Sequence, residues 1–230
     1  MELNNKIRKT IILLTVLLLI PITIYFGSVV FGSKKYAFIT FAVTLLSLIP
    51  FFITFERKKE NTMKVTMLAT MTALSVFGRL AFSFFPFFKP VTAIVIICGM
   101  FLGPEAGFLC GALTALISNF YFGQGAFTPF MMFAWGIVGF FAGLFSFLLR
   151  KNTVVLLMYG VIGGVGYSLI VDIWSVIWQD GYFNFSRYAV LIATALPMTV
   201  MYAVSNVIFL LILAAPFGKK LERIKEKYGV

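Results

Sequence analysis

Histidine is absent from this chain of 230 residues, and charged residues make up only 12% of it. The absence of histidine excludes H-E-x-x-H zinc sites and His-based catalytic triads. The sequence contains no G-x-x-x-x-G-K-[ST] phosphate loop, so the chain does not hydrolyse ATP through that motif. Of its eight acidic residues, only Glu105, Asp172 and Asp180 lie near the long apolar runs, too few to line a cation pathway. These absences predict that the chain is not an enzyme.

Most residues of the sequence are apolar, with 61% hydrophobic residues and a mean hydropathy of +1.01. A soluble domain is only about half apolar and about a quarter charged. A bilayer core about 30 Å thick needs roughly 20 apolar residues per helix. Apolar runs that do not alternate predict an all-α polytopic membrane helical bundle rather than a barrel. The eight predicted spans are 10–31, 37–55, 63–84, 90–103, 106–120, 127–149, 153–177 and 188–215.

The first apolar run could be a signal peptide, because Lys6, Arg8 and Lys9 form a basic segment before it. The run is long, however, and no A-x-A-like cleavage site follows it. A second apolar run begins almost at once. We therefore predict a retained transmembrane hairpin at 1–55, followed by a six-helix substrate-binding membrane core at 56–230. The hairpin holds no polar residue that points into the core, so we expect it to be dispensable for ligand binding.

The distribution of positive charge predicts the orientation of these spans, because Lys and Arg prefer cytoplasmic loops. With the N-terminus inside, fourteen of the 19 Lys and Arg residues fall in cytoplasmic segments. This bias predicts a multi-pass cell-membrane protein with both termini in the cytoplasm. The net charge of +11 then follows from topology and attraction to anionic lipid, and requires no nucleic acid partner. Cys98 and Cys110 fall toward the reducing side, so we expect two small buried thiols rather than a disulfide.

Three loops then face the outside, at 85–90, 120–126 and roughly 178–187, and all are rich in aromatic residues. An aromatic belt at the membrane interface explains part of this pattern. It does not explain the segment "SNFYFGQGAFTPFMMF", in which Asn119 and Gln124 stand beside Gly123 and Gly125. Glycines allow a compact turn. The amides either contact a ligand or cap the ends of two helices.

Few charged residues lie within the spans, and a charge in hydrocarbon marks a cavity or a pair. Arg79 and Asp172 both lie in the outer parts of their spans. They form a salt bridge that fixes helix packing, or they contact a ligand, or both. Lys89 lies at the outer surface, where its side chain is expected to reach toward lipid headgroups.

Small residues recur at intervals of four, which lets helices approach closely in lipid. Ala69 and Ala73 form one such pair in the first core helix. Residues 60–225, with six spans and this Ala-x-x-x-Ala motif, resemble the S component, the substrate-binding subunit, of energy-coupling factor (ECF) vitamin transporters. The segments "FKPVTAIVIICG" and "GFLCGALTALISNFYFGQGAFTPFMMFAWGIVGFFAGL" resemble the subgroup assigned to cobalamin uptake. The N-terminal hairpin departs from the minimal six-helix pattern.

This resemblance implies that Ala69 and Ala73 dock on a shared transmembrane T component, and that two ATPases drive import. It implies a vitamin, with cobalamin or a related corrinoid as the best match, bound from outside under the three loops. No covalent cofactor and no metal are expected. Alternatives are another vitamin, an autonomous secondary transporter or a membrane scaffold protein. The candidate substrate-binding residues are Arg79, Phe84, Lys89, Asn119, Tyr121, Gln124, Phe127, Asp172 and Trp178.

Overall fold

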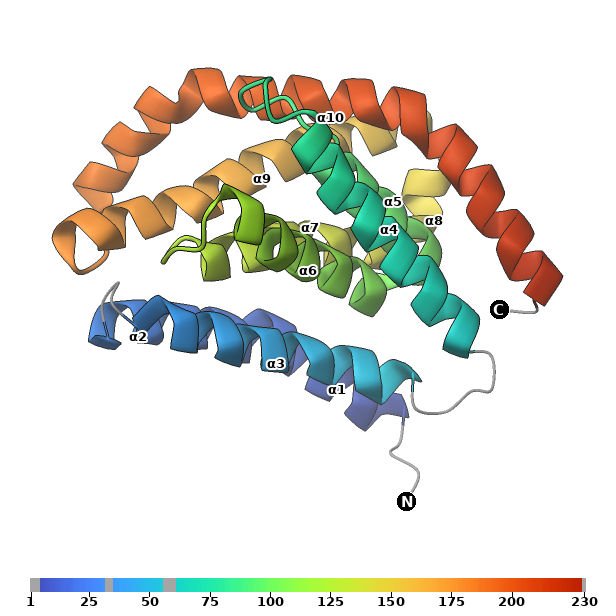
Figure 1. Cartoon of the computed structure of the whole chain (residues 1–230), viewed down its shortest axis with the longest axis horizontal. Coiled ribbons are helices and arrows are strands. Elements are labelled where there is room, and N and C mark those ends of the chain that lie inside the picture. The colour runs from blue at the N-terminus through green and yellow to red at the C-terminus, as the bar shows by residue number, and fades with distance from the viewer. Residues whose placement is uncertain (1–4, 32–34, 56–60, 229–230) are drawn as a thin grey trace.

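The structure, a computed structural model, describes residues 5–31, 35–55 and 61–228 (Figure 1). These residues form helices joined by short turns, without any strand, which confirms the predicted all-α class. The elements are α1 (Asn5–Leu14), the π-helical η1 (Thr15–Leu19), α2 (Ile20–Phe31), α3 (Tyr36–Phe55), α4 (Asn61–Ala81), α5 (Val91–Leu102), α6 (Pro104–Phe122), α7 (Thr128–Leu144), α8 (Ser146–Lys151), α9 (Thr153–Asp180) and α10 (Phe185–Tyr228).

Each of the eight predicted apolar runs is helical, and four helices are long and apolar enough to cross a membrane, as in a multi-pass protein. Most boundaries differ from the prediction by a few residues, and two differ more. The run 127–149 is divided at Phe145, whose φ of −92° and ψ of 13° leave the helical range. The last helix, with 44 residues, continues to Tyr228 instead of ending near 215. Hydropathy falls at 215 because lysines begin there, but Pro216 does not interrupt the helix.

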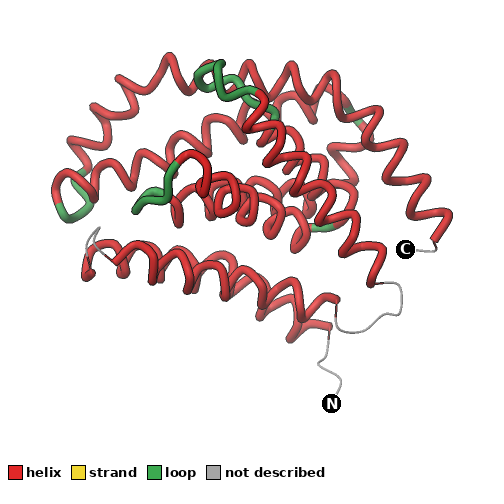
Figure 2. Tube along the Cα trace, viewed as in Figure 1, coloured by secondary structure: helices red, strands yellow, loops and turns green. Residues whose placement is uncertain are grey.

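The helices are arranged in three groups (Figure 1). The N-terminal hairpin, formed by α1, η1, α2 and α3, lies along one side and packs on α6 and α7. Helices α5, α6 and α7 form the centre, and α9 with the long, bowed α10 covers the opposite side. The first turn of α1 and the last turn of α10 lie at the same end of the bundle (Figure 1). The loops that join α6 to α7 and α9 to α10 lie at the other end (Figure 2).

Glycines bring the central helices into backbone contact. A Cβ atom added to Gly107 would lie 2.3 Å from the carbonyl oxygen of Gly139, and one added to Gly139 would lie 2.3 Å from that of Gly107. A Cβ on Gly99 would lie 2.1 Å from the same Gly139 oxygen. These separations are shorter than any real contact of a Cβ atom, so larger residues would push the backbones apart. The small-residue pattern in these helices therefore serves packing within the chain.

We predict that Gly107→Val strongly destabilises the protein, because the obstructing atom belongs to a helix backbone and cannot rotate away. Overpacking typically costs about 1–3 kcal/mol, and a backbone clash lies at the upper end or beyond. Gly166→Val is the matched control, since a Cβ on Gly166 meets nothing within 4 Å. Thermal unfolding in detergent should show a large loss of stability for Gly107→Val and little change for Gly166→Val. Equal stability of the two variants would contradict the packing described here.

Candidate functional site

Arg79 is a buried cation at the end of α4, with only 9% of its surface exposed. Its Nη1 donates a hydrogen bond of 2.7 Å to Oδ1 of Asn119 and another to the hydroxyl of Ser118. Both acceptors lie in the last turns of α6. A charge in the low-dielectric interior is tolerated only when it is paired or hydrogen-bonded. These bonds therefore determine where the end of α4 sits against α6.

The amide of Asn119 extends this network into the following loop. Its Nδ2 donates to Oγ1 of Thr128 over 3.0 Å, and Thr128 in turn donates to Oε1 of Gln124 over 3.0 Å. Nε2 of Gln124 donates to the carbonyl of Leu116 over 2.8 Å. Asn119 itself is fully buried. Both amides thus join the end of α6 to the start of α7 through Thr128 and the carbonyl of Leu116.

Aromatic rings surround the remaining faces of the cations. The guanidinium of Arg79 lies 4.6 Å from the ring centroid of Phe122 and 5.1 Å from that of Trp135. Nζ of Lys89 lies 4.9 Å from the Phe122 centroid, on a ring shared by both cations. Such cation–π contacts stabilise a positive charge where water is scarce. Partial burial, with the nearby charge of Arg79, lowers the pKa of Lys89.

The backbone of Lys89 is held by one hydroxyl from the far end of the sequence. Ser205 of α10 accepts a hydrogen bond of 2.9 Å from the N–H of Lys89 and donates one of 2.9 Å to its carbonyl. The loop 82–90 that carries Lys89 is therefore attached to α10 (Figure 2). Phe87 in this loop has a φ of +61°, a left-handed conformation that is strained for a bulky residue.

These groups enclose a cavity of about 190 Å³. On one side Trp135 stacks on Tyr167, with ring centroids 4.9 Å apart and ring planes 17° apart. Tyr202 makes edge contacts with Tyr167 at 5.2 Å and with Phe87 at 5.6 Å. The cavity thus combines two cations, flat aromatic surfaces and a few polar groups, as small-molecule sites do. Its lining residues are Arg79, Pro86, Phe87, Lys89, Val91, Thr92, Trp135, Tyr167, Tyr202 and Asn206.

Of the residues predicted from sequence, Arg79 and Lys89 line this cavity, while Asn119 and Gln124 belong to the hydrogen-bond network behind Arg79. Arg79 and Asp172 are not brought together: the hydrogen bonds of Arg79 go to α6, and no ion pair joins the two within the described residues. The interpretation of a salt bridge between them is therefore replaced by the bonds to Ser118 and Asn119.

The other predicted residues lie elsewhere. Phe84 is 90% exposed and Tyr121 is 72% exposed, both on the molecular surface. Phe127 packs against Trp174, with ring centroids 5.5 Å apart. Trp178 borders a separate cavity of about 170 Å³, between the end of α9 and the N-terminal hairpin.

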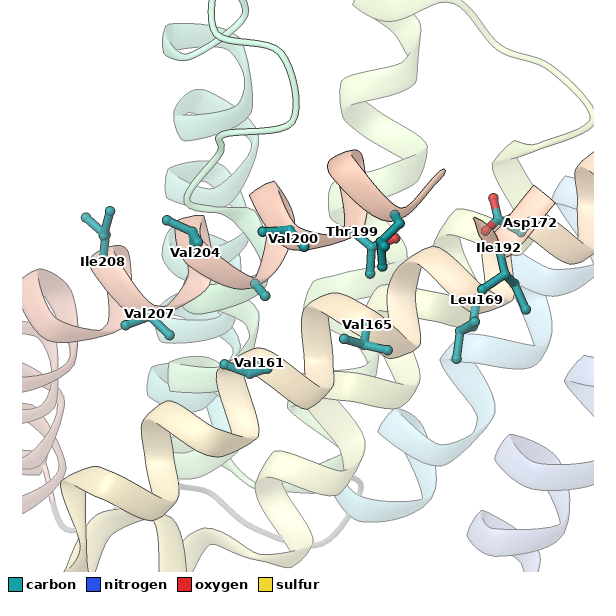
Figure 3. Close-up of a pocket in the computed structure, with 12 residues that line it drawn as sticks. Val161, Val165, Leu169, Asp172, Ile192, Thr199, Val200, Val204, Val207 and Ile208 are labelled. Atoms are coloured by element: carbon teal, nitrogen blue, oxygen red, sulfur yellow. The ribbon is translucent and has the colours of Figure 1, made fainter. Parts of the chain in front are cut away.

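Asp172 lies in a groove of about 440 Å³ between α9 and α10, shown in Figure 3. The other side chains of this groove are aliphatic, such as Val161, Val165 and Ile192, with Thr199 as the other polar residue. Ligand sites need several convergent polar groups to fix orientation. The groove offers few of them, so the smaller aromatic cavity is the better candidate site.

Sequence reasoning missed most of the cavity wall, including Trp135, Tyr167, Tyr202 and Asn206. These residues are uncharged, and each lies within a long, mostly apolar run. One signal was available, because polar side chains inside membrane spans usually face a cavity or a partner. That signal applies to the tyrosines and Asn206 as it does to Arg79.

The fold and the cavity define a class: a multi-pass α-helical membrane protein with a small cavity lined by polar and aromatic side chains. Residues 59–223 match the family model of the ECF-type riboflavin transporter, S component, and the chain belongs to that family. It is therefore a substrate-specific membrane subunit of an ECF importer, not an enzyme, and such subunits pair with a T component and ATPases. No curated protein and no solved structure matched the chain. The match supports the predicted S component but not the cobalamin-type subgroup.

We predict that Asn119→Ala destabilises the protein even without ligand, because it removes one acceptor from a buried guanidinium and one donor from Thr128. A buried group that loses its partner typically costs about 1–3 kcal/mol. Gln179→Ala is the control, because it removes an exposed bond to Arg187. Thermal unfolding of the ligand-free proteins should separate the two variants. An unaltered Asn119→Ala protein would show that the network does not support the site.

Proposed function

We propose that this chain binds riboflavin in the aromatic cavity and delivers it to the ECF complex for import. The observation that carries the proposal is the combination of stacked aromatic rings with two cations around one cavity. The isoalloxazine ring of a flavin is flat and bears carbonyl oxygens and a ring N–H. Aromatic side chains provide stacking surface, and Arg79 and Lys89 provide donors for the carbonyls. Asn206, whose Nδ2 already donates to the Gly160 carbonyl, keeps its oxygen as an acceptor.

The size of the cavity favours a flavin over the corrinoid expected from sequence. Pockets for drug-sized ligands typically have about 300–1,000 Å³, and this cavity has about 190 Å³. A flavin would fit after a limited outward movement of the 82–90 loop, in which Phe87 is already strained. A corrin ring with its nucleotide tail is several times larger, and would require the helices to separate. The family to which the chain belongs, the ECF-type riboflavin transporter S component, also supports riboflavin as the ligand.

The binding proposal predicts that the purified chain quenches flavin fluorescence in a saturable way, and that Tyr202→Leu weakens this binding. An aromatic pair contributes about 0.5–1.5 kcal/mol beyond its buried area, so the affinity should fall by about threefold to tenfold. Tyr228→Leu, at the far end of α10, is the control and should bind normally. Competition with unlabelled riboflavin and with cobalamin identifies the vitamin. Binding of cobalamin without binding of riboflavin would refute the ligand while leaving the S-component role intact.

The exposed face of α4 supports a docking role for Ala69 and Ala73. Both side chains are exposed, and their exposed neighbours include Thr62, Thr66 and Thr70. The exposed Val65 and Phe77 lie on the same helix, so this face combines apolar with small and hydroxyl side chains. Small and hydroxyl residues are typical of helix–helix contacts in membranes. We therefore propose that a helix of the T component packs on this face.

If this face docks the T component, Ala69→Leu combined with Ala73→Leu should abolish ATP-driven uptake into proteoliposomes that contain the whole complex. Riboflavin binding to the isolated chain should stay within about twofold, because neither residue lines the cavity. The matched control is Ala189→Leu with Ala193→Leu, an exposed pair at the same spacing on α10. Full uptake by the α4 variant would place the docking surface elsewhere.

A further inference from the structure

The N-terminal hairpin has no assigned role. All of it precedes residues 59–223, which match the family, and none of its residues lines the aromatic cavity. Yet α3 packs on α6 and α7 as well as on α2, and its residues Ile39, Val43 and Ser47 are buried. Because these contacts fix the position of the hairpin, its opposite side is available to a binding partner at a defined place.

That other side borders the proposed docking face. A groove of about 560 Å³ runs between α4 and α6 and contains both Ala69 and Ala73. Leu48 of α3 forms part of its lining, so the groove has walls from three helices. The rest of the lining is Val65, Leu68, Thr72, Val76, Phe77, Leu80, Leu109, Leu113 and Ile117.

The lining of this groove is apolar except for Thr72. Thr72 is only 4% exposed, and its hydroxyl is buried next to the sulfur of Cys110 rather than open to the groove. The groove therefore offers apolar side chains and two alanines, the kind of surface on which another membrane helix packs closely.

The hairpin also has the spacing and the depth that a helix contact requires. Phe38, Phe41, Leu45 and Leu48 recur at intervals of three and four, which places them along one seam of α3. Leu48 lies seven residues before the end of α3, about 10 Å along its axis at about 1.5 Å per residue. Ala69 lies eight residues after the start of α4, about 12 Å. Both residues therefore lie at similar depth.

We propose that the N-terminal hairpin is part of the docking surface, and that α3 and α4 together receive one transmembrane helix of the T component. This inference rests on the proposed function, because it assumes that the α4 face docks. The groove is apolar and carries no charged residue, which suits a helix in the bilayer rather than a water-soluble ATPase. Leu48 packs against the side of that helix.

Cross-linking from within the full-length chain tests the contact directly. A photoreactive benzoylphenylalanine in place of Leu48 should cross-link to the T component when the assembled complex is irradiated in membranes. The same group in place of Phe38, which lies on the same seam but outside the groove, is the control. Cross-links from position 48 to lipid alone would show that lipid occupies the groove, and would overturn the proposal.

Substitution gives a second, independent measurement. Leu48→Trp should fill the groove and lower the amount of T component that copurifies by at least about tenfold, while riboflavin binding is unchanged. Phe38→Trp, on the same seam but outside the groove, is the matched control and should copurify normally. Normal copurification of the Leu48→Trp variant would refute the role of the hairpin. Normal copurification of the Ala69→Leu and Ala73→Leu double variant would in addition refute the docking face on α4. The two variants therefore distinguish failure of the hairpin proposal from failure of the proposed docking role.

Discussion

The burial of Arg79 is the constraint on which the candidate site depends. A full charge inside a bundle that is otherwise hydrocarbon costs several kcal/mol unless its hydrogen bonds are made. The acceptors Ser118 and Asn119 both lie at the end of α6, so α4 must end there. Asn119 also donates a hydrogen bond to Thr128, so the same network holds the start of α7 against the end of α6. One charge thereby orders three helix ends, and its remaining faces meet the rings of Phe122 and Trp135.

Close packing at the opposite end of the bundle explains why the cavity lies where it does. Gly99, Gly107, Gly139 and Gly143 allow α5, α6 and α7 to meet backbone to backbone near the turn at Gly103. No space remains there for a ligand. Gly111 continues this contact as far as the backbone of Trp135, whereas the side chain of Trp135 lines the cavity together with Arg79. The small residues therefore close one side of the bundle, while the polar and aromatic residues line the other.

The sequence predicted the helices well because long apolar runs in a bilayer have few alternatives to helix. It also identified Arg79 and Lys89, because a charged residue beside a long apolar run is easy to recognise in a sequence. It could not show that the amides of Asn119 and Gln124 are occupied by internal partners, because those bonds depend on how two helices meet. Tyr167 and Tyr202 come from separate helices and converge only in three dimensions. The family match does not support the preference for a corrinoid, and the sequence alone offers no check on ligand size, because cavity volume is a property of the packed bundle.

Helix α4 connects the candidate site with the proposed docking surface. Arg79 lies ten residues beyond Ala69, about 15 Å along the axis at about 1.5 Å per residue, and α4 contains no proline. A helix of this kind moves as a unit, so a ligand that displaces the guanidinium or the adjoining 82–90 loop also shifts the end that carries the alanines. The hairpin is attached to α6 and α7 instead. On the proposed function, α4 would therefore move while α3 stays in place. The groove that receives the T component would then change its width when a ligand binds in the cavity.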